Sequence, residues 1–259
     1  MSTSFITIER HGSVALLTFS RPDQLNAMSG AMVEEIVAAI AETGRDDTAR
    51  ALVLCGAGGN FMAGADIKAY AKQSAEAFRD FQESAGRIYG ALEALPKPVI
   101  AAIEGYALGG GFEIALSADL IVAHPDAKLG LPEVKLGLVP GGGGTQRLAR
   151  KLGPNRAAEL LMTGRFASAR EMADWGVVNR VAEDALGEAL ALAEQMARHP
   201  AGALADLKRL NLAAWQTGLG AGLEAERDAV CALFLAGGMQ RIRDFVARSE
   251  RKKTEGSKA

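Results

Sequence analysis

The sequence predicts an α/β fold, with strands and helices alternating along residues 1–125 and helices dominating after residue 145. Short apolar runs of strand length recur between amphipathic helical segments in the first of these stretches, and this order is typical of an α/β core. The chain also has 49 alanines and 30 glycines among its 259 residues, which favours tight helix packing and close backbone contacts. We therefore expect an α/β core over residues 1–195 and a helical C-terminal region over residues 196–259.

Five short segments predict strands in the first half of the chain. Residues 5–10 and 14–20 predict two strands joined by a turn at His11 and Gly12. The other three segments are apolar runs that indicate buried strands, at residues 51–55, 98–103 and 119–123.

Helical segments fall between these strands. Apolar residues recur at helical spacing from Met32 to Ile40, and Ser29 in front of them fits the helix N-cap. Further helices are expected at 66–72, 75–95 and around 111–117. Beyond residue 145, apart from a short strand-like stretch at 176–181, helices are expected at 145–152, 154–162, 168–175, 187–198, 201–216, 221–235 and 239–249.

The charge and the cysteine content argue against several classes of function. The chain carries 29 Lys and Arg against 31 Asp and Glu, a net charge of −2, which gives little attraction for nucleic acid or an acidic membrane. Cys55 and Cys231 lie far apart in apolar runs, so we expect two reduced, buried thiols and no structural zinc site. Neither a targeting segment nor an apolar run of spanning length is visible, and we expect a cytoplasmic protein without membrane contact.

Glycine is concentrated in three clusters, at 56–64, 109–111 and 141–144. The first cluster has Phe61 where a dinucleotide-binding fingerprint needs glycine, and the last lacks the Gly-Lys-Ser/Thr of a phosphate-binding loop. The chain also has no Gly-x-Ser-x-Gly elbow, and its three histidines show no local partnership. These observations argue against nucleotide chemistry and serine hydrolysis.

Two acidic residues lie close to these glycines. Glu113 falls in the expected first turn of a helix after Gly109–Gly111, and Glu133 follows Pro132 in a largely apolar segment. Each acid alone also fits a structural role, because acidic side chains favour helix starts. However, backbone N–H groups at such a helix start can stabilise an enolate oxygen, while a nearby carboxylate moves a proton at carbon. The combination therefore favours proton transfer beside a carbonyl group.

Five stretches form a pattern that is typical of one family. They are QLNAM (24–28), NFMAGADIK (60–68), PVIAAIEGYALGGGFEIALSADLIVA (98–123), LGLPEVKLGLVPGGGGTQRLAR (129–150) and MTGRFASAREMADWGVVNRV (162–181). In order and spacing the chain resembles the crotonase (enoyl-CoA hydratase/isomerase) superfamily up to about residue 235. The resemblance implies a ClpP/crotonase-like β/α spiral core over 1–195 that carries an acyl-CoA site, and an oligomerisation region over 196–259.

The resemblance also implies catalytic roles for single residues. The backbone N–H groups of Ala65 and Gly110 would hold the thioester carbonyl oxygen of an acyl-CoA. Glu113 would activate water for attack at the β-carbon, and Glu133 would exchange the proton at the α-carbon. Family isomerases often keep an acid only at the second of these two places, so the presence of both favours hydration of a 2-enoyl-CoA.

The substrate and partner follow from the same resemblance. Coenzyme A would be part of the substrate, and neither a catalytic cofactor nor a metal is expected. Ala27, Ala63 and Ile67 would border the CoA moiety, and Lys68 fits either a phosphate contact or an exposed helix face. The implied assembly is a homotrimer or a dimer of trimers.

Some alternatives stay open at this point. Isomerisation, hydrolysis and carbon–carbon cleavage of an acyl-CoA use the same enolate stabilisation. A non-catalytic module that binds CoA, or binds RNA through the basic tail 249–259, is an alternative of another class. The chain departs from the family pattern at Met62, at Phe112, which is expected to reshape the acyl pocket, and at 236–241.

Overall fold

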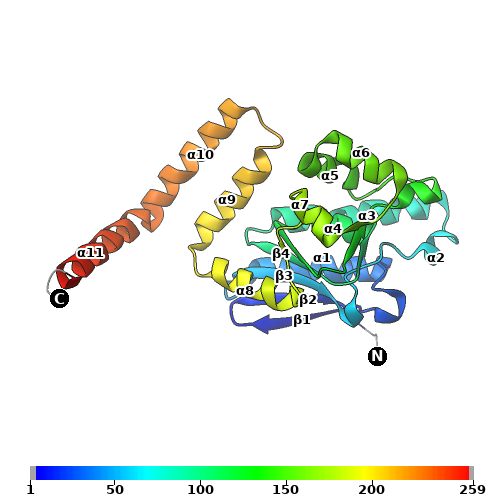
Figure 1. The fold of residues 1–259 in the computed structure, drawn as a ribbon, viewed down its shortest axis with the longest axis horizontal. Helices are drawn as coiled ribbons and strands as arrows, with labels where there is room; N and C mark the ends of the chain where they lie inside the picture. The colour runs from blue at the N-terminus through cyan, green and yellow to red at the C-terminus, as the bar shows by residue number, and fades with distance from the viewer. Residues whose placement is uncertain (1–3, 257–259) are drawn as a thin grey trace. The chain divides into compact units, whose positions relative to one another are not determined.

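A computed structural model describes residues 4–256 of the chain, and Figure 1 shows its fold. The chain divides into two compact units, the first ending at Ala205 and the second beginning at Asp206. This division falls inside helix α9 (Ala201–Ala213), whereas the sequence analysis places it between residues 195 and 196. In the described residues, both sheets belong to the first unit, and the second unit is helical.

The main sheet has six strands in the order β1-β2-β3-β4-β6-β9. Their bounds are β1 (Ile6–His11), β2 (Val14–Phe19), β3 (Ala51–Gly56), β4 (Val99–Ile103), β6 (Leu120–Ala123) and β9 (Arg180–Val181). β1 and β2 form an antiparallel hairpin and the other pairs are parallel. The five predicted strands are confirmed, although β1 includes His11 and the hairpin turn therefore lies at Gly12 and Ser13.

The helices of the first unit also follow the prediction. They are α1 (Gly30–Arg45), α2 (Ile67–Tyr70), α3 (Ala75–Ala94), α4 (Gly110–Ser117), α5 (Gly144–Leu152), α6 (Pro154–Thr163), α7 (Ala169–Asp174) and α8 (Ala185–Ala197). The prediction did not include the short 3-10 helices η1 (Pro22–Gln24), η2 (Ala57–Gly59) and η3 (Glu133–Leu136). Ser29 caps α1 as expected, because its hydroxyl accepts a 3.4 Å hydrogen bond from the Met32 N–H.

Helices cover both faces of the main sheet. In β3, Leu52 and Leu54 belong to the apolar core shared with α1 and α3, whereas Ala51 and Val53 pack in a second core with α8. Alternate side chains of a strand point to opposite faces, so a strand that is covered on both faces is apolar throughout. Figure 1 shows α8 along one side of these strands, which explains the apolar runs in the sequence.

A second, three-stranded sheet is absent from the sequence prediction. β5 (Tyr106–Leu108) runs parallel to β7 (Lys128–Gly130), and β8 (Ala167–Ser168) is antiparallel to β7. Strands this short show no sequence period, and they form because distant segments of the chain pair. The sheet contributes to the site, since β5 leads through Gly109 into α4.

The second unit contains the rest of α9, followed by α10 (Leu219–Leu233), the π-helical turn η4 (Phe234–Gly238) and α11 (Met239–Gly256). Part of the expected basic tail thus belongs to α11, while residues 257–259 lie outside the described residues. Within residues 4–256, no helix combines the length and the apolar character that crossing a bilayer requires.

The two cysteines have different environments. Cys55 is buried in β3, as expected, and the Thr18 hydroxyl lies 3.3 Å from its sulfur. The expectation was wrong for Cys231, which is exposed on α10. An apolar run predicts burial only where another element covers it, and several large apolar side chains of this unit are exposed, among them Leu219, Leu235 and Phe245.

Gly111, in the first turn of α4, provides a test of backbone packing beside the site. A Cβ atom at Gly111 would lie 2.2 Å from the Met62 carbonyl oxygen, which belongs to the backbone and cannot move aside easily. We predict that Gly111→Ala lowers the free energy of unfolding by about 1–3 kcal/mol, as overpacking does. Urea unfolding followed by circular dichroism measures the change.

Gly86→Ala is the matched control. Gly86 also lies within a helix, α3, but a Cβ atom there would meet no atom within 4 Å. This substitution should stabilise the chain by about 0.4–1 kcal/mol, because alanine loses less conformational entropy on folding. If Gly111→Ala behaves like Gly86→Ala, the close approach to Met62 is not a constraint.

Candidate active site

Most of the residues expected in the site line one cavity of about 450 Å³ in the first unit. The lining residues from the sequence prediction are Ala63, Ala65, Ile67, Gly110, Glu113 and Glu133. Ala27 and Lys68 are not among them: Ala27 directly precedes the lining residue Met28, and Lys68 is exposed on α2. Much of the remaining wall is apolar or aromatic, with Tyr70, Phe78 and Phe81 from α2 and α3.

The backbone N–H of Ala65 points away from the segment that holds it in place. The Met28 N–H donates to the Gly64 carbonyl at 2.8 Å, and the Asp66 N–H donates to the Met28 carbonyl at 3.0 Å, which forms a parallel bridge opposite Ala65. In an extended chain, successive peptide groups point to opposite sides. The Ala65 N–H therefore faces away from Met28, and it has no hydrogen-bond acceptor within residues 4–256.

Gly110 supplies the second N–H. It is the first residue of α4, and the N–H groups of a first helical turn have no acceptor within the helix. Across residues 4–256, no other acceptor receives this N–H. The Gly110 N–H thus remains available for a bound group, with the positive end of the α4 dipole behind it.

Two further glycines let these segments approach each other. A Cβ atom on Gly109 would lie 3.7 Å from the Gly64 Cα, and one on Gly64 would lie 3.3 Å from the Leu108 carbonyl oxygen. Gly64 and Gly109 also have positive φ angles, of 96° and 50°, which side chains strongly disfavour. The glycines that the sequence analysis singled out at 64 and 109 therefore serve close backbone approach at the cavity.

Glu113 is buried in α4, with only 3% of its surface exposed, and one of its oxygens is fixed by the backbone. The N–H groups of Gly142 and Gly144 donate to Glu113 Oε1 at 2.8 Å and 2.7 Å. Burial raises the pKa of this carboxyl, and the two N–H groups oppose the rise because they stabilise the charged form. The 141–144 glycine run thus holds Glu113, a role that the sequence analysis did not assign to it.

Glu133 has a different environment. It opens the 3-10 helix η3 and lines the cavity, and among the described residues no group donates a hydrogen bond to its buried Oε2 atom. Burial, together with a smaller effect of the nearby Glu113 charge, raises the pKa of Glu133 to about 7. A carboxyl group with this pKa can give up or accept a proton near neutral pH.

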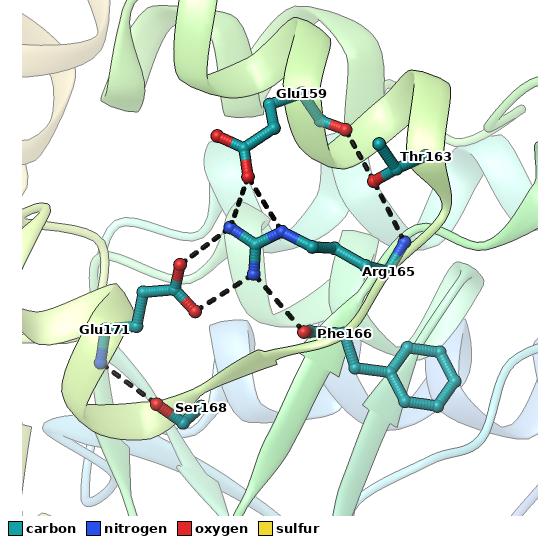
Figure 2. A network of polar contacts seen from close by, with 6 residues as sticks. All are labelled: Glu159, Thr163, Arg165, Phe166, Ser168 and Glu171. Atoms are coloured by element: carbon teal, nitrogen blue, oxygen red, sulfur yellow. Dashed lines mark hydrogen bonds and ion pairs between the residues drawn. The ribbon is translucent and has the colours of Figure 1, made fainter.

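Arg165 organises the turn that packs against η3. Figure 2 shows its guanidinium between Glu159 of α6 and Glu171 of α7. Arg165 Nε donates to Glu159 Oε1 at 2.8 Å, while Nη2 and Nη1 donate to the two Glu171 oxygens at 2.7 and 3.1 Å. These bonds connect α6 to α7 across the turn that contains Gly164 and Phe166.

This turn contacts η3 directly. A Cβ atom on Gly164 would lie 3.0 Å from Val134 Cγ1, and Lys135 Nζ lies 5.1 Å from the centre of the Phe166 ring. Val134 and Lys135 follow Glu133 in η3. The contacts of the turn therefore support the short helix that presents Glu133 to the cavity.

Hydrogen bonds of the Arg21 and Asn26 side chains fix the turn around Ala27. Arg21 donates to the Ala27 carbonyl oxygen and, at 3.3 Å, to Asp66 Oδ2. The amide of Asn26, which is fully buried, donates to the carbonyls of Ala57 and Asn60 at 2.9 and 2.7 Å. These bonds hold the segment before Met28 next to the 56–66 segment.

The sequence analysis missed Tyr89, which lines the cavity, and Arg147, which contacts the loop that binds Glu113. Tyr89 lies on the buried face of α3 and lines the cavity, and a Cβ atom on Gly142 would overlap its ring at 2.3 Å. Helical spacing indicates that Tyr89 is buried but not that it reaches the cavity. Phe112, by contrast, is fully buried in the core and is not a lining residue, so the expectation that it shapes the acyl pocket was wrong.

Together, the fold and the site define a class of protein that can stabilise a carbonyl oxyanion and transfer protons beside it. Two backbone N–H donors and two carboxyl groups line one largely apolar cavity. The described residues contain no group of three or more His, Cys, Asp or Glu side chains placed to hold a metal ion.

Comparison with known proteins identifies the family. The family described as enoyl-CoA hydratase/isomerase matches residues 9–246, and the chain belongs to it. The chain is 40% identical over 231 residues to the probable enoyl-CoA hydratase echA8 of Mycobacterium bovis, with 88% of each chain covered. It is 41% identical over 184 residues to the short-chain-enoyl-CoA hydratase of Clostridium acetobutylicum, which covers 71% of this chain and 70% of the relative.

Solved structures show the same relationship. The structure of enoyl-CoA hydratase subunit I from Geobacillus kaustophilus HTA426 matches with a TM-score of 0.89 and 40% identity, covering 94% of this chain and 95% of the other. An enoyl-CoA hydratase from Polaromonas sp. JS666 matches with a TM-score of 0.90 and 33% identity, covering 94% and 97%. The crotonase fold expected from the sequence is confirmed.

The raised pKa of Glu133 has a consequence for stability. The folded chain keeps the Glu133 proton up to about pH 7, whereas the unfolded chain loses it near 4.5, so this carboxyl group destabilises the fold progressively as pH rises through that window. We predict that Glu133→Gln raises the midpoint of thermal unfolding at pH 8 by about 2–4 °C, equivalent to about 1 kcal/mol. The gain should be smaller at pH 5, where the wild-type side chain is largely protonated.

Differential scanning calorimetry at the two pH values measures this difference. Glu83→Gln is the matched control, since Glu83 is exposed on α3 and its substitution should change the midpoint equally at both pH values. A Glu133→Gln effect that is the same at pH 5 and pH 8 would show that Glu133 does not ionise at an unusual pH.

Proposed function

We propose that the chain catalyses the reversible addition of water to a 2-enoyl-CoA, which gives a 3-hydroxyacyl-CoA. The observation that carries this proposal is the placement of Glu113 and Glu133 in one cavity with the Ala65 and Gly110 N–H groups. The relatives named as enoyl-CoA hydratases, at about 40% identity, support the same activity.

Ala65 and Gly110 are proposed to bind the thioester carbonyl oxygen. As water adds to the β-carbon, the electrons of the carbon–carbon double bond shift toward the thioester, and negative charge grows on this oxygen. The parallel bridge at Met28 and the start of α4 fix both N–H groups before the reaction begins. Such donors need no reorganisation as charge develops, and the loss of one typically raises the barrier by about 3–4 kcal/mol.

Glu113 and Glu133 are proposed to move the two protons. Glu113 accepts a proton from water while the water oxygen bonds to the β-carbon, and Glu133 donates a proton to the α-carbon. The double bond is replaced by one new C–O bond and one new C–H bond, and exchange with solvent restores both carboxyl groups. The backbone N–H groups on Glu113 favour its charged form, while the apolar surroundings of Glu133 favour its protonated form.

Coenzyme A enters this proposal as part of the substrate, with no separate catalytic cofactor. We place it against Ala27 and Ala63, whose small side chains leave space, and against Ile67, which is exposed on α2. Lys68 is exposed on α2 and can approach a phosphate group. The salt dependence of the KM in a Lys68→Ala chain, compared with the unchanged chain, distinguishes a phosphate contact from an uninvolved surface lysine.

The second unit is proposed to assemble the chain into a homotrimer or a dimer of trimers. Its helices carry exposed apolar side chains, which include Leu219, Leu235 and Phe245. Large exposed apolar side chains that cluster on a surface mark interfaces between proteins. Multi-angle light scattering of the purified chain measures the mass, and a monomer at micromolar concentration would contradict this assembly.

Turnover of crotonyl-CoA is the direct test of the proposed function. The unchanged chain should remove the absorbance of the conjugated thioester and form 3-hydroxybutyryl-CoA. Glu113→Gln and Glu133→Gln should each lower kcat by about 10²–10⁴-fold, because each removes one proton-transfer group while keeping its shape. Absence of turnover on every 2-enoyl-CoA tested would refute the hydratase function.

A second assay separates hydration from isomerisation. A 3-enoyl-CoA is supplied in place of the 2-enoyl-CoA, and the products are identified by mass spectrometry and NMR. An isomerase needs only one group that moves a proton between carbons, so Glu113→Gln should leave isomerisation largely intact if that is the main reaction. Strong loss in both carboxamide variants favours hydration, and the thermal unfolding of each variant controls for folding.

A further inference from the structure

Arg147 connects α5 to α3 and to the glycine loop that directly precedes α5. Its Nε and Nη2 atoms donate to the two Glu93 oxygens at 2.7 and 2.9 Å, so the pair is bidentate. Its third contact runs from Nη1 to the Gly142 carbonyl oxygen at 2.6 Å. The planar guanidinium suits this set of three acceptors, because its donors lie in a rigid fork.

Gly142 connects this arginine to Glu113. The Gly142 carbonyl accepts from Arg147, and the Gly142 N–H donates to Glu113 Oε1 at 2.8 Å. The ring of Tyr89 packs against both residues. The Arg147 guanidinium lies 5.6 Å from the ring centre, and a Cβ atom on Gly142 would overlap the ring. Gly142, which binds the Glu113 carboxylate, is therefore held in place by contacts with Glu113, Arg147 and Tyr89.

We propose that Arg147 is a positioning residue for Glu113. Its bidentate hydrogen bonds to Glu93 fix the glycine loop at 141–144 in the geometry needed for hydration. The inference rests on the proposed function, since it assigns to Arg147 a role in the step that Glu113 performs. Arg147 is not a lining residue of the cavity, and it acts through Gly142.

The contacts predict a selective effect on catalysis. Without Arg147, the Gly142 carbonyl loses its charged partner, and the loop can move away from Glu113. Water activation depends on Glu113, whereas removal of the α-proton from a saturated acyl-CoA depends on Glu133 and the two backbone donors. Loss of Arg147 should therefore impair hydration far more than exchange of the α-proton.

Arg147 also acts through its charge. The guanidinium lowers the pKa of Glu113 against the rise caused by burial. The other titratable groups around this carboxyl are Tyr89 on α3, Tyr70 on α2 and Glu133 on η3, and none of them carries a positive charge. Removal of Arg147 should shift the acidic limb of the hydration pH profile to higher pH, while a lysine at this place keeps the charge and the limb.

The experiment uses the full chain and three variants. Arg147→Met removes both the bidentate hydrogen bonds and the charge, and Arg147→Lys removes only the bidentate bonds. Arg150→Met is the matched control on the same helix, because within residues 4–256 Arg150 hydrogen-bonds to Gln146 alone. Hydration of crotonyl-CoA gives kcat, KM and the pH profile. Exchange of the α-protons of butyryl-CoA in D₂O, followed by NMR, reports the second activity.

We expect Arg147→Met to lower the kcat of hydration by about 10–100-fold, because a misplacement of a catalytic group by about 1 Å can cost about 10²-fold, with KM changed less than about twofold. Exchange of the α-proton should fall less than about threefold. Arg147→Lys should also lower kcat but leave the acidic limb in place, and Arg150→Met should match the unchanged chain.

Other results would overturn the proposal. Full hydration activity in Arg147→Met, or an equal loss of hydration and exchange, would show that the arginine does not position Glu113. If Arg147→Met fails to fold, Glu93→Gln replaces it, since it weakens the same fork and should lower hydration more than exchange. If the unchanged chain hydrates no 2-enoyl-CoA, both the proposed function and this inference are contradicted. If the unchanged chain hydrates crotonyl-CoA and the Arg147 variants do so equally well, only this inference is contradicted.

Discussion

The close approach of two backbone segments is the constraint on which the site depends. The Met62 N–H donates to the Tyr106 carbonyl at 2.9 Å, and the Leu108 N–H donates to the Met62 carbonyl at 3.0 Å. This pairing brings the segment that ends at Ala65 against the strand that leads into α4. A side chain at Gly111 would force the two segments apart, because a Cβ atom there would lie 2.2 Å from the Met62 carbonyl oxygen. The two backbone donors share a cavity only while this approach holds.

The same architecture gives two identical side chains different protonation behaviour. Glu113 is deeply buried but receives two backbone N–H bonds, which stabilise its charged form. Glu133 is less buried, yet its Oε2 atom has no protein partner among the described residues, and its pKa rises to about 7. The backbone N–H groups that each carboxyl group receives therefore matter as well as its depth, because they oppose the rise in pKa that burial causes.

Each of these carboxyl groups is backed by an arginine that bridges two helices. Arg147 joins α5 to Glu93 of α3 and supports the loop that binds Glu113. Arg165 joins α6 to α7 and supports the turn packed against η3, which carries Glu133 (Figure 2). In both cases, the hydrogen bonds of an arginine to residues on helices fix a short, irregular segment. Short segments that line a cavity need such support, because they have little regular structure of their own.

The sequence by itself determined the elements with strong local signals. The apolar run at 51–55, the Ser29 cap and the position of Glu113 in a first helical turn all follow from neighbouring residues, and the motif order identified the family. Only the tertiary structure decided the three-residue strand β5, the binding of Glu113 by Gly142 and Gly144, and the exposure of Cys231. These features arise where distant segments meet, or where no described segment covers an apolar face. Local periodicity contains no information on either condition, because it records only which side of an element is apolar.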